Sequence, residues 1–182
     1  MMDRKKFFAG IRHGPFPDTL TKKQVEGIET ILDATPPDLD PRALAYILAT
    51  AFWETGRTME PIQERGSKAY LRSKKYWPWI GRGYVQLTWK GNYDRYRAPV
   101  LEHYGVDIVK DPNNAMIPKV AAFILVDGML RGAFTGTGLS HYFNDHTSDW
   151  VHARQIINRL DKASEIAGIA KRFYADIIGA QV

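Results

Sequence analysis

Apolar and polar residues are arranged with helical spacing in two stretches near the start of the chain. The sequence TLTKKQVEGIETILDAT places apolar side chains three and four positions apart, and Thr21 with Gln24 matches a capping box. After the turn-rich sequence TPPDLDP, Asp40 and Pro41 are the residue types favoured at a helix N-cap and first position. We therefore expect one helix in each stretch.

From Gly56, a natural C-terminal stop for the second helix, to about Gly91 the helical periodicity weakens. Long irregular segments in compact domains are usually functional or disordered, and the aromatic content of this one favours function. Short strands could lie within it, for instance at GYVQLT. Helical patterns return in NYDRYRAPVLEHYG, in PKVAAFILVDGMLRG, where Pro118 again stands at a helix start, and in residues 148–178. We predict a mainly α fold and one domain over residues 1–182.

Composition narrows the class of protein without choosing a function. With 45% hydrophobic and 25% charged residues the chain is typical of globular proteins, and the absence of cysteine excludes disulfides, thiolate metal sites and cysteine nucleophiles. No run of about 18 apolar residues occurs and the N-terminus lacks an apolar signal-peptide core, so we expect neither a membrane span nor an export signal. The net charge of +5 favours approach to a polyanion, whether nucleic acid or an acidic cell wall.

Glu54 is a candidate general acid. It follows Ile47 by seven residues and Ala51 by three, which places it at the edge of the apolar face, and it lies at the negative end of the helix dipole. Both effects disfavour the ionised carboxylate, as a general acid requires. Glu60 and Glu64 follow in the next loop, and either could supply the second carboxylate of an inverting glycoside hydrolase. Alternatively, Glu54 simply extends into solvent.

The sequence WIGRGYVQLTWKGNY supplies groups suited to a carbohydrate. Two glycines flank Arg82 and permit a tight backbone path, and Gln86, Thr88 and Asn92 can bind sugar hydroxyls or hold a water. Arg82 and Tyr84 are further candidate substrate contacts. Flat aromatic faces for sugar rings are available nearby, although some of these residues must pack the core. They are Trp53, Tyr76, Trp77, Trp79, Tyr84 and Trp89.

A zinc site is a weaker alternative. His141, Asp145, His146 and His152 could surround a metal, but HExxH is absent and these histidines do not share one helical face. GRGYVQ is not a dinucleotide fingerprint, because Gln86 stands where the third glycine would be. We therefore expect neither a metal nor a nucleotide cofactor.

The sequence resembles the glycoside hydrolase family 19 chitinases and, more closely, the phage and prophage endolysins of that fold. The matching blocks occur in family order and cover nearly the whole chain. They are DRKKFFAGIR, LAYILATAFWETGRTMEPIQERG, GRGYVQLTWKGNY, FTGTGLSHYF and ARQIINRLDKASEIAGIAKRFY.

This resemblance implies a role for each matching residue. Glu54 falls on the general acid, Glu64 falls on the general base, and Thr88 falls on the hydroxyl residue that positions the attacking water. The matching substrate-binding positions are Gln86, Asn92 and Asn158. On this basis Glu54→Gln is expected to abolish activity while leaving thermal stability nearly intact.

The resemblance also implies a lysozyme-like α-helical fold with two lobes flanking a cleft, a small β hairpin at most, inversion of configuration and no cofactor. The expected partners are β-1,4-linked peptidoglycan strands or chitin oligomers, with no nucleic acid and no stable membrane insertion, and we expect a monomer. An endolysin without a signal peptide would accumulate in the host cytoplasm and reach the wall in the periplasm through a holin-type membrane lesion.

A binding module without catalysis is the alternative from another class. The Arg and Lys residues between Tyr70 and Arg97 lie among aromatic residues, a combination that could hold single-stranded nucleic acid by stacking and phosphate contacts. The same surface could hold a glycan without cleaving it. Nucleic-acid affinity that falls steeply with salt, without lysis of cell walls, would indicate such a module.

Overall fold

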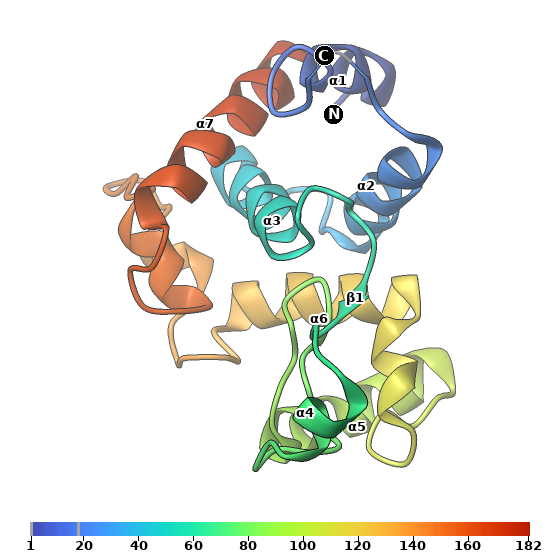
Figure 1. Cartoon of the computed structure of the whole chain (residues 1–182). Helices are drawn as coiled ribbons and strands as arrows, with labels where there is room; N and C mark the ends of the chain where they lie inside the picture. The colour runs from blue at the N-terminus through green and yellow to red at the C-terminus, as the bar shows by residue number, and fades with distance from the viewer. Residues whose placement is uncertain (1, 18) are drawn as a thin grey trace.

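The structure, a computed structural model, describes residues 2–17 and 19–182. Helices dominate these residues, and the prediction of a mainly α fold is confirmed (Figure 1). No helix in the described ranges is long and apolar enough to cross a lipid bilayer. In chain order the elements are α1 Arg4–Ile11, α2 Lys22–Ala34, α3 Pro41–Glu54, β1 Ile62–Gln63, α4 Lys68–Arg72, β2 Arg82–Gly83, α5 Lys90–Tyr104, η1 Pro112–Met116, α6 Pro118–Arg131, η2 Leu139–His141, η3 His152–Ile156 and α7 Ala163–Gly179.

Helix α3 lies in the core. Every residue from Ala43 to Phe52 is buried, because the helix is apolar on all sides and therefore needs protein around it. Asp40 caps its first turn by accepting a hydrogen bond from the Arg42 backbone N–H, as its residue type predicted. Helix α7 packs along α3 in the most extensive contact between elements. The core thus surrounds α3 up to Phe52, two residues before its last residue, Glu54.

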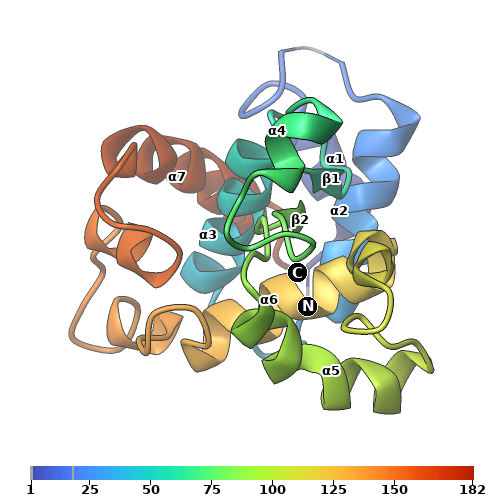
Figure 2. The ribbon, with the colours of Figure 1, turned by 60° about the horizontal axis from the view of Figure 1, so that its bottom comes forward.

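The elements form two groups on either side of α6. Helices α1, α2, α3 and α7 gather in the first group, and β1, β2, α4 and α5 gather in the second (Figure 1). Helix α6 contacts α2 and α3 on one side and β2 and α5 on the other. Figure 2 shows that α4 and α5, which overlap in the first view, are separated by the β1–β2 pair. This is the predicted two-lobed arrangement.

Helix α2 begins and packs as its sequence indicates. Thr21 and Gln24 form the predicted capping box, each side chain bonding the other residue's backbone N–H at 3.1 and 2.9 Å. Gly27 lies against the loop that follows α3, and a Cβ at this position would stand 1.8 Å from the Met59 carbonyl oxygen. Only glycine allows this approach between helix and loop.

The β structure is smaller than GYVQLT suggested. Strand β1 pairs antiparallel with β2, with Ile62 opposite Gly83, so that of the predicted strand only Gly83 is in a ladder. The chain then turns back sharply, and Arg82 and Leu87 exchange backbone hydrogen bonds of 3.2 and 2.8 Å. Gln86 takes a positive φ of +54° in this turn, which an extended strand does not allow.

Both ends of the chain differ from the predicted pattern. Helix α1 was not predicted, yet Asp3 caps it by accepting from the Lys6 N–H at 3.1 Å, and the Asp3 N–H bonds the Ala180 carbonyl at 2.8 Å. The helix expected over residues 148–178 is interrupted, since α7 starts only at Ala163. Lys162 just before it has a φ of +57°, which no α-helix accommodates.

Candidate active site

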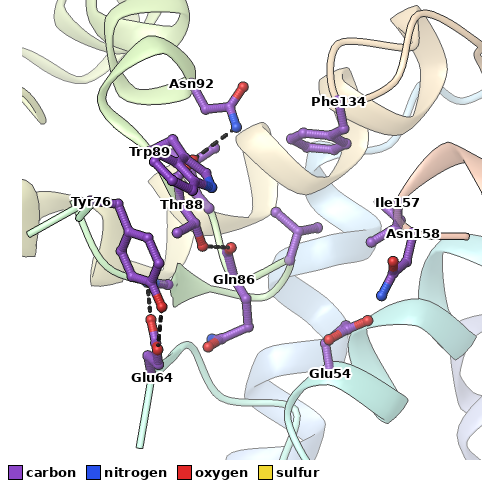
Figure 3. Close-up of a pocket in the computed structure, with 13 residues that line it drawn as sticks. Glu54, Glu64, Tyr76, Gln86, Thr88, Trp89, Asn92, Phe134, Ile157 and Asn158 are labelled. Atoms are coloured by element: carbon purple, nitrogen blue, oxygen red, sulfur yellow. Dashed lines mark hydrogen bonds between the residues drawn. The ribbon is translucent and has the colours of Figure 1, made fainter. Parts of the chain in front are cut away.

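A cavity of about 530 Å³ is lined by residues of both lobes. It lies where the C-terminal end of α3, the segment after β1, the turn between β2 and α5, and the segment after η3 come together (Figure 3). The lining residues are Glu54, Glu64, Tyr76, Gly81, Val85, Gln86, Leu87, Thr88, Trp89, Asn92, Phe134, Ile157 and Asn158. Six of the eight candidate site residues are therefore found around one cavity.

Glu54 is the last residue of α3 and carries its carboxylate from the core into the cavity. Its Oε1 accepts a hydrogen bond of 2.8 Å from Arg154 Nη1, and the two side chains are 18% and 3% exposed. Arg154 Nε also donates to the Asp161 carbonyl at 3.1 Å, which fixes the guanidinium in place. The sequence placed Glu54 correctly at an apolar edge but gave no indication of this cation, which lies 100 positions away along the chain.

Glu64 is held through both carboxylate oxygens. Tyr76 Oη donates to its Oε1 at 2.8 Å, and the Gly81 backbone N–H donates to its Oε2 at 3.1 Å. The Glu64 backbone N–H in turn donates to the Gly81 carbonyl at 2.7 Å. The hydrogen bond to Glu64 raises the pKa of the Tyr76 hydroxyl, because loss of its proton would place two negative charges side by side. Tyr76 was predicted only as an aromatic face, so this contact adds a positioning role.

Thr88, Gln86 and Asn92 form a chain of hydrogen bonds along one wall (Figure 3). Asn92 Nδ2 donates to the Thr88 carbonyl at 2.8 Å, Thr88 Oγ1 donates to the Gln86 carbonyl at 2.7 Å, and Gln86 Nε2 donates to the Ile62 carbonyl at 2.9 Å. Because the Thr88 hydroxyl proton is engaged, its oxygen is free to accept a hydrogen bond from a water in the cavity.

Gly81 connects this wall to Glu64. Its N–H bonds the carboxylate, and a Cβ built on it would stand 2.8 Å from Gln86 Oε1 and 3.3 Å from Thr88 Oγ1. A side chain at this position would therefore displace the polar groups of the wall, so the first glycine of GRG serves the close approach, whereas the second, Gly83, takes the positive φ of +86°.

Asn158 reaches the cavity from the segment after η3. Its Oδ1 accepts from the Arg159 N–H at 2.8 Å, and its backbone N–H donates to the Arg154 carbonyl at 3.0 Å. Figure 3 shows the Asn158 amide next to Glu54 and on the side facing away from Glu64. The Asn158 carboxamide nitrogen is thus placed to bind a ligand beside Glu54.

Arg82 and Tyr84 do not line this cavity, contrary to their prediction as substrate contacts. Arg82 is 5% exposed, and its Nη1 donates to the Pro78 carbonyl at 3.0 Å and to Tyr93 Oη at 3.1 Å. Tyr84 is fully buried. The turn directs both side chains into the lobe, where the bonds of Arg82 tie the loop to Tyr93. Of the candidate aromatic residues, Tyr76 and Trp89 line the cavity, and Trp89 is 53% exposed.

Glu60, the rival for the second carboxylate, lies elsewhere. It pairs with Lys23 at 3.0 Å and lines a smaller cavity beside Met59 and Tyr84. Among residues 2–17 and 19–182, no three His, Asp or Glu side chains are grouped closely enough to hold a metal ion, so the geometry gives no support to a zinc site at His141 or its neighbours.

Two solved structures share this fold. Chitinase C from Streptomyces griseus HUT6037 matches with a TM-score of 0.57 and 18% identity, over 93% of this chain and 76% of that one. A chitinase C mutant matches with a TM-score of 0.53 and 17% identity, over 99% and 77% of the two chains. No protein-family model matches the chain, and no curated protein sequence matches it. The predicted lysozyme-like fold, of the chitinase type, is confirmed, and the endolysin branch and the roles of individual residues stay predictions.

Proposed function

We propose that this chain is a glycoside hydrolase that cleaves β-1,4 glycosidic bonds in the amino-sugar strands of peptidoglycan, with inversion and without a cofactor. The observation that carries the proposal is the meeting of Glu54 and Glu64, from different lobes, at one cavity whose remaining polar groups are uncharged. Two carboxylates with a polar wall between them are what inverting hydrolysis of a sugar chain requires.

In the proposed mechanism Glu54 donates a proton to the glycosidic oxygen. Arg154 stabilises the carboxylate that forms when the proton leaves, which favours the transfer once it starts.

Glu64 is the proposed general base. Tyr76 and Gly81 fix its carboxylate, so its lone pairs point in constant directions, and Thr88 offers a hydroxyl oxygen on the other side of Gly81. A water that donates one hydrogen bond to Glu64 and one to Thr88 has its own lone pair free for the anomeric carbon. Water attacking the face opposite the leaving group gives inversion.

The substrate strand would lie along the polar wall. We propose that Gln86, Asn92 and Asn158 bind its hydroxyl and acetamido groups and that Trp89 stacks on a ring. Peptidoglycan is proposed because the sequence resembles phage and prophage endolysins. Such an enzyme would act in the periplasm after release from the cytoplasm. We propose that it acts as a monomer and that residues 1–182 form one catalytic domain. Chitin is the second candidate, favoured by the two chitinases that share the fold.

The test is digestion of purified sacculi followed by mass spectrometry of the released muropeptides. We expect new reducing ends from the wild type, none from Glu54→Gln or Glu64→Gln, and normal release from Glu60→Gln. The mass of the terminal sugar shows whether the bond cut is that of a muramidase or a glucosaminidase, and chitin hexamer digested in parallel reports chitinase activity. Full activity of Glu54→Gln or Glu64→Gln would refute the mechanism.

A further inference from the structure

The positive charge of the chain is concentrated in one segment. Residues 61–93 contain seven of the 25 Lys and Arg residues but one of the 20 Asp and Glu residues, so the rest of the chain has 18 basic against 19 acidic residues. The net charge of +5 therefore comes entirely from this part of one lobe. Most of it lies in residues 65–75, which we call the basic segment and which contain helix α4.

Three cations of the basic segment, Arg65, Lys68 and Lys75, are exposed and have no acidic partner among the described residues. Among the described residues, no carboxylate forms an ion pair with Arg65, Lys68 or Lys75, whereas lysines elsewhere, such as Lys22 and Lys90, pair with a carboxylate one helical turn away. Unpaired like charges in one short segment repel one another and destabilise it. A bound anion would remove this repulsion.

Two exposed aromatic rings accompany these cations. Tyr70 is 50% exposed and Trp77 is 39% exposed. Lys74 Nζ lies 3.8 Å from the centre of the Tyr70 ring, and Arg72 lies 6.0 Å from the centre of the Trp77 ring. Cations that lie beside exposed aromatic rings offer charged and apolar contact area together, so the surface suits a ligand that carries both anionic and apolar groups.

The basic segment begins and ends at the wall of the cavity. Glu64, the residue before it, and Tyr76, the residue after it, both line the cavity, and a hydrogen bond of 2.8 Å joins their side chains. Figure 2 shows α4 projecting on the outer side of the β1–β2 pair. A polymer that occupies the cavity and carries side groups can therefore place one of these groups on the basic segment.

We propose that the basic segment binds the carboxylates of the peptide stems attached to the glycan strand that occupies the cavity. This proposal rests on the proposed function and specifies its substrate. Peptide stems carry free carboxylates together with apolar side chains and are attached to the strand itself. A chitin strand has neither feature, so the basic segment distinguishes the two sugar polymers by charge.

The experiment neutralises exposed cations of the basic segment that form no ion pair with a carboxylate among the described residues. The variant Arg65→Gln with Lys68→Gln and Lys75→Gln removes three such charges. The control variant removes three exposed lysines outside the basic segment, by Lys5→Gln, Lys110→Gln and Lys171→Gln. The two variants have the same net charge, so only the location of the charge differs.

Both variants and the wild type are compared on native sacculi and on sacculi whose carboxylates have been converted to amides with carbodiimide and an amine. Binding is measured by co-sedimentation at low salt, and cleavage is measured by reducing ends. We expect the first variant to bind native sacculi roughly tenfold more weakly, since each exposed ion pair contributes a factor of about 1.4 to 5. It should bind amidated sacculi as the wild type does, and the control variant should match the wild type on both.

Equal loss in the two triple variants, or equal loss on native and amidated sacculi, would overturn the proposal. Binding to a single-stranded oligonucleotide is measured in parallel. If the first variant binds the oligonucleotide more weakly than the wild type but binds sacculi equally well, the proposal is overturned and the surface is assigned to nucleic acid. If the wild type releases no reducing ends from sacculi, the proposed function fails, whereas the binding comparison still decides whether the basic segment recognises carboxylates.

Discussion

Glu54→Gln is the substitution for which the structure changes the prediction most. The sequence suggested a carboxylate at a helix end whose replacement would leave stability nearly intact. In the structure the carboxylate is the counter-charge of Arg154, whose side chain is 3% exposed. Removing the negative charge leaves a buried guanidinium without its partner, so the variant should lose stability as well as activity.

The magnitude follows from the burial of the pair. Removing one partner of a fully buried ion pair costs about 3–5 kcal/mol, whereas breaking an exposed pair costs about 0–1 kcal/mol. Glu54 is 18% exposed, a glutamine can still accept from Arg154 Nη1, and Arg154 Nε keeps its bond to the Asp161 carbonyl. We therefore expect a loss of about 1–3 kcal/mol, which lowers Tm by roughly 2–12 °C in a chain of this size.

The assay combines urea unfolding with sacculus digestion for four proteins: wild type, Glu54→Gln, Arg154→Met and the double variant. In the double variant no buried charge is left unpaired, so it should recover part of the stability lost in the single variants while remaining inactive. Glu60→Gln is the matched control. Its partner Lys23 is 71% exposed and Glu60 is 40% exposed, so we expect a change of at most about 0.5 kcal/mol and normal activity.

Two results would refute this reasoning. Additive losses in the double variant would mean that Glu54 and Arg154 do not interact energetically. An active Glu54→Gln protein with reduced stability would mean that the carboxylate has a structural role only and that the acid must be sought elsewhere.

Three further predictions concern backbone approach and pH. Gly81→Ala should lower kcat at least tenfold with little loss of stability, because its Cβ would stand 2.8 Å from Gln86 Oε1 at the cavity wall; steady-state kinetics on sacculi measure this. Gly27→Ala should destabilise by about 3 kcal/mol or more, because its Cβ would meet the Met59 carbonyl at 1.8 Å; urea unfolding measures it. A hydrogen bond from Arg97 of α5 lowers the pKa of Asp107 from 3.8 to about 2. The stability that Asp107 contributes is therefore present above about pH 4 and is lost as the pH falls toward 2. In that window the urea midpoint of Asp107→Asn should decline less steeply than that of the wild type.

Each of these has a control or a contrary outcome. Gly168→Ala in α7 meets nothing within 4 Å and should be neutral or stabilising by about 0.5–1 kcal/mol, which separates crowding from loss of glycine as such. Unchanged kcat in Gly81→Ala would mean that the polar wall is not used in the reaction. An acid decline of Asp107→Asn that parallels the wild type would assign the acid sensitivity to other carboxylates.

The parts of the fold that the sequence predicted correctly are governed by local rules. The capping box of Thr21 and Gln24 and the start of α3 at Asp40 depend on neighbours within a turn, and all of these residues take the expected positions. The start of α7 could not be predicted, because a lysine at position 162 with positive φ follows no residue preference.

The residues of the candidate site that match the family motifs were predicted, whereas contacts between residues far apart in the sequence were not. Spacing and family order pointed to Glu54, Glu64 and Thr88, which line one cavity. The Arg154 partner of Glu54 lies 100 positions away, and no local pattern connects the two residues. The sequence also does not indicate in which direction a side chain points from a tight turn. For this reason Arg82 was expected in the cavity, whereas its side chain lies inside the lobe.

The order in which the chain is made bears on when the cavity can exist. Glu54, Glu64 and Thr88 are translated early, whereas Arg154, Asn158 and the helix that packs along α3 are translated after all of them. A nascent chain still attached to the ribosome can hold both acids and yet lack the cation, the far wall and the brace that fix their positions. The finished cavity therefore arises only after α7 has been synthesised, and truncation after α6 would leave both carboxylates present without a complete site around them.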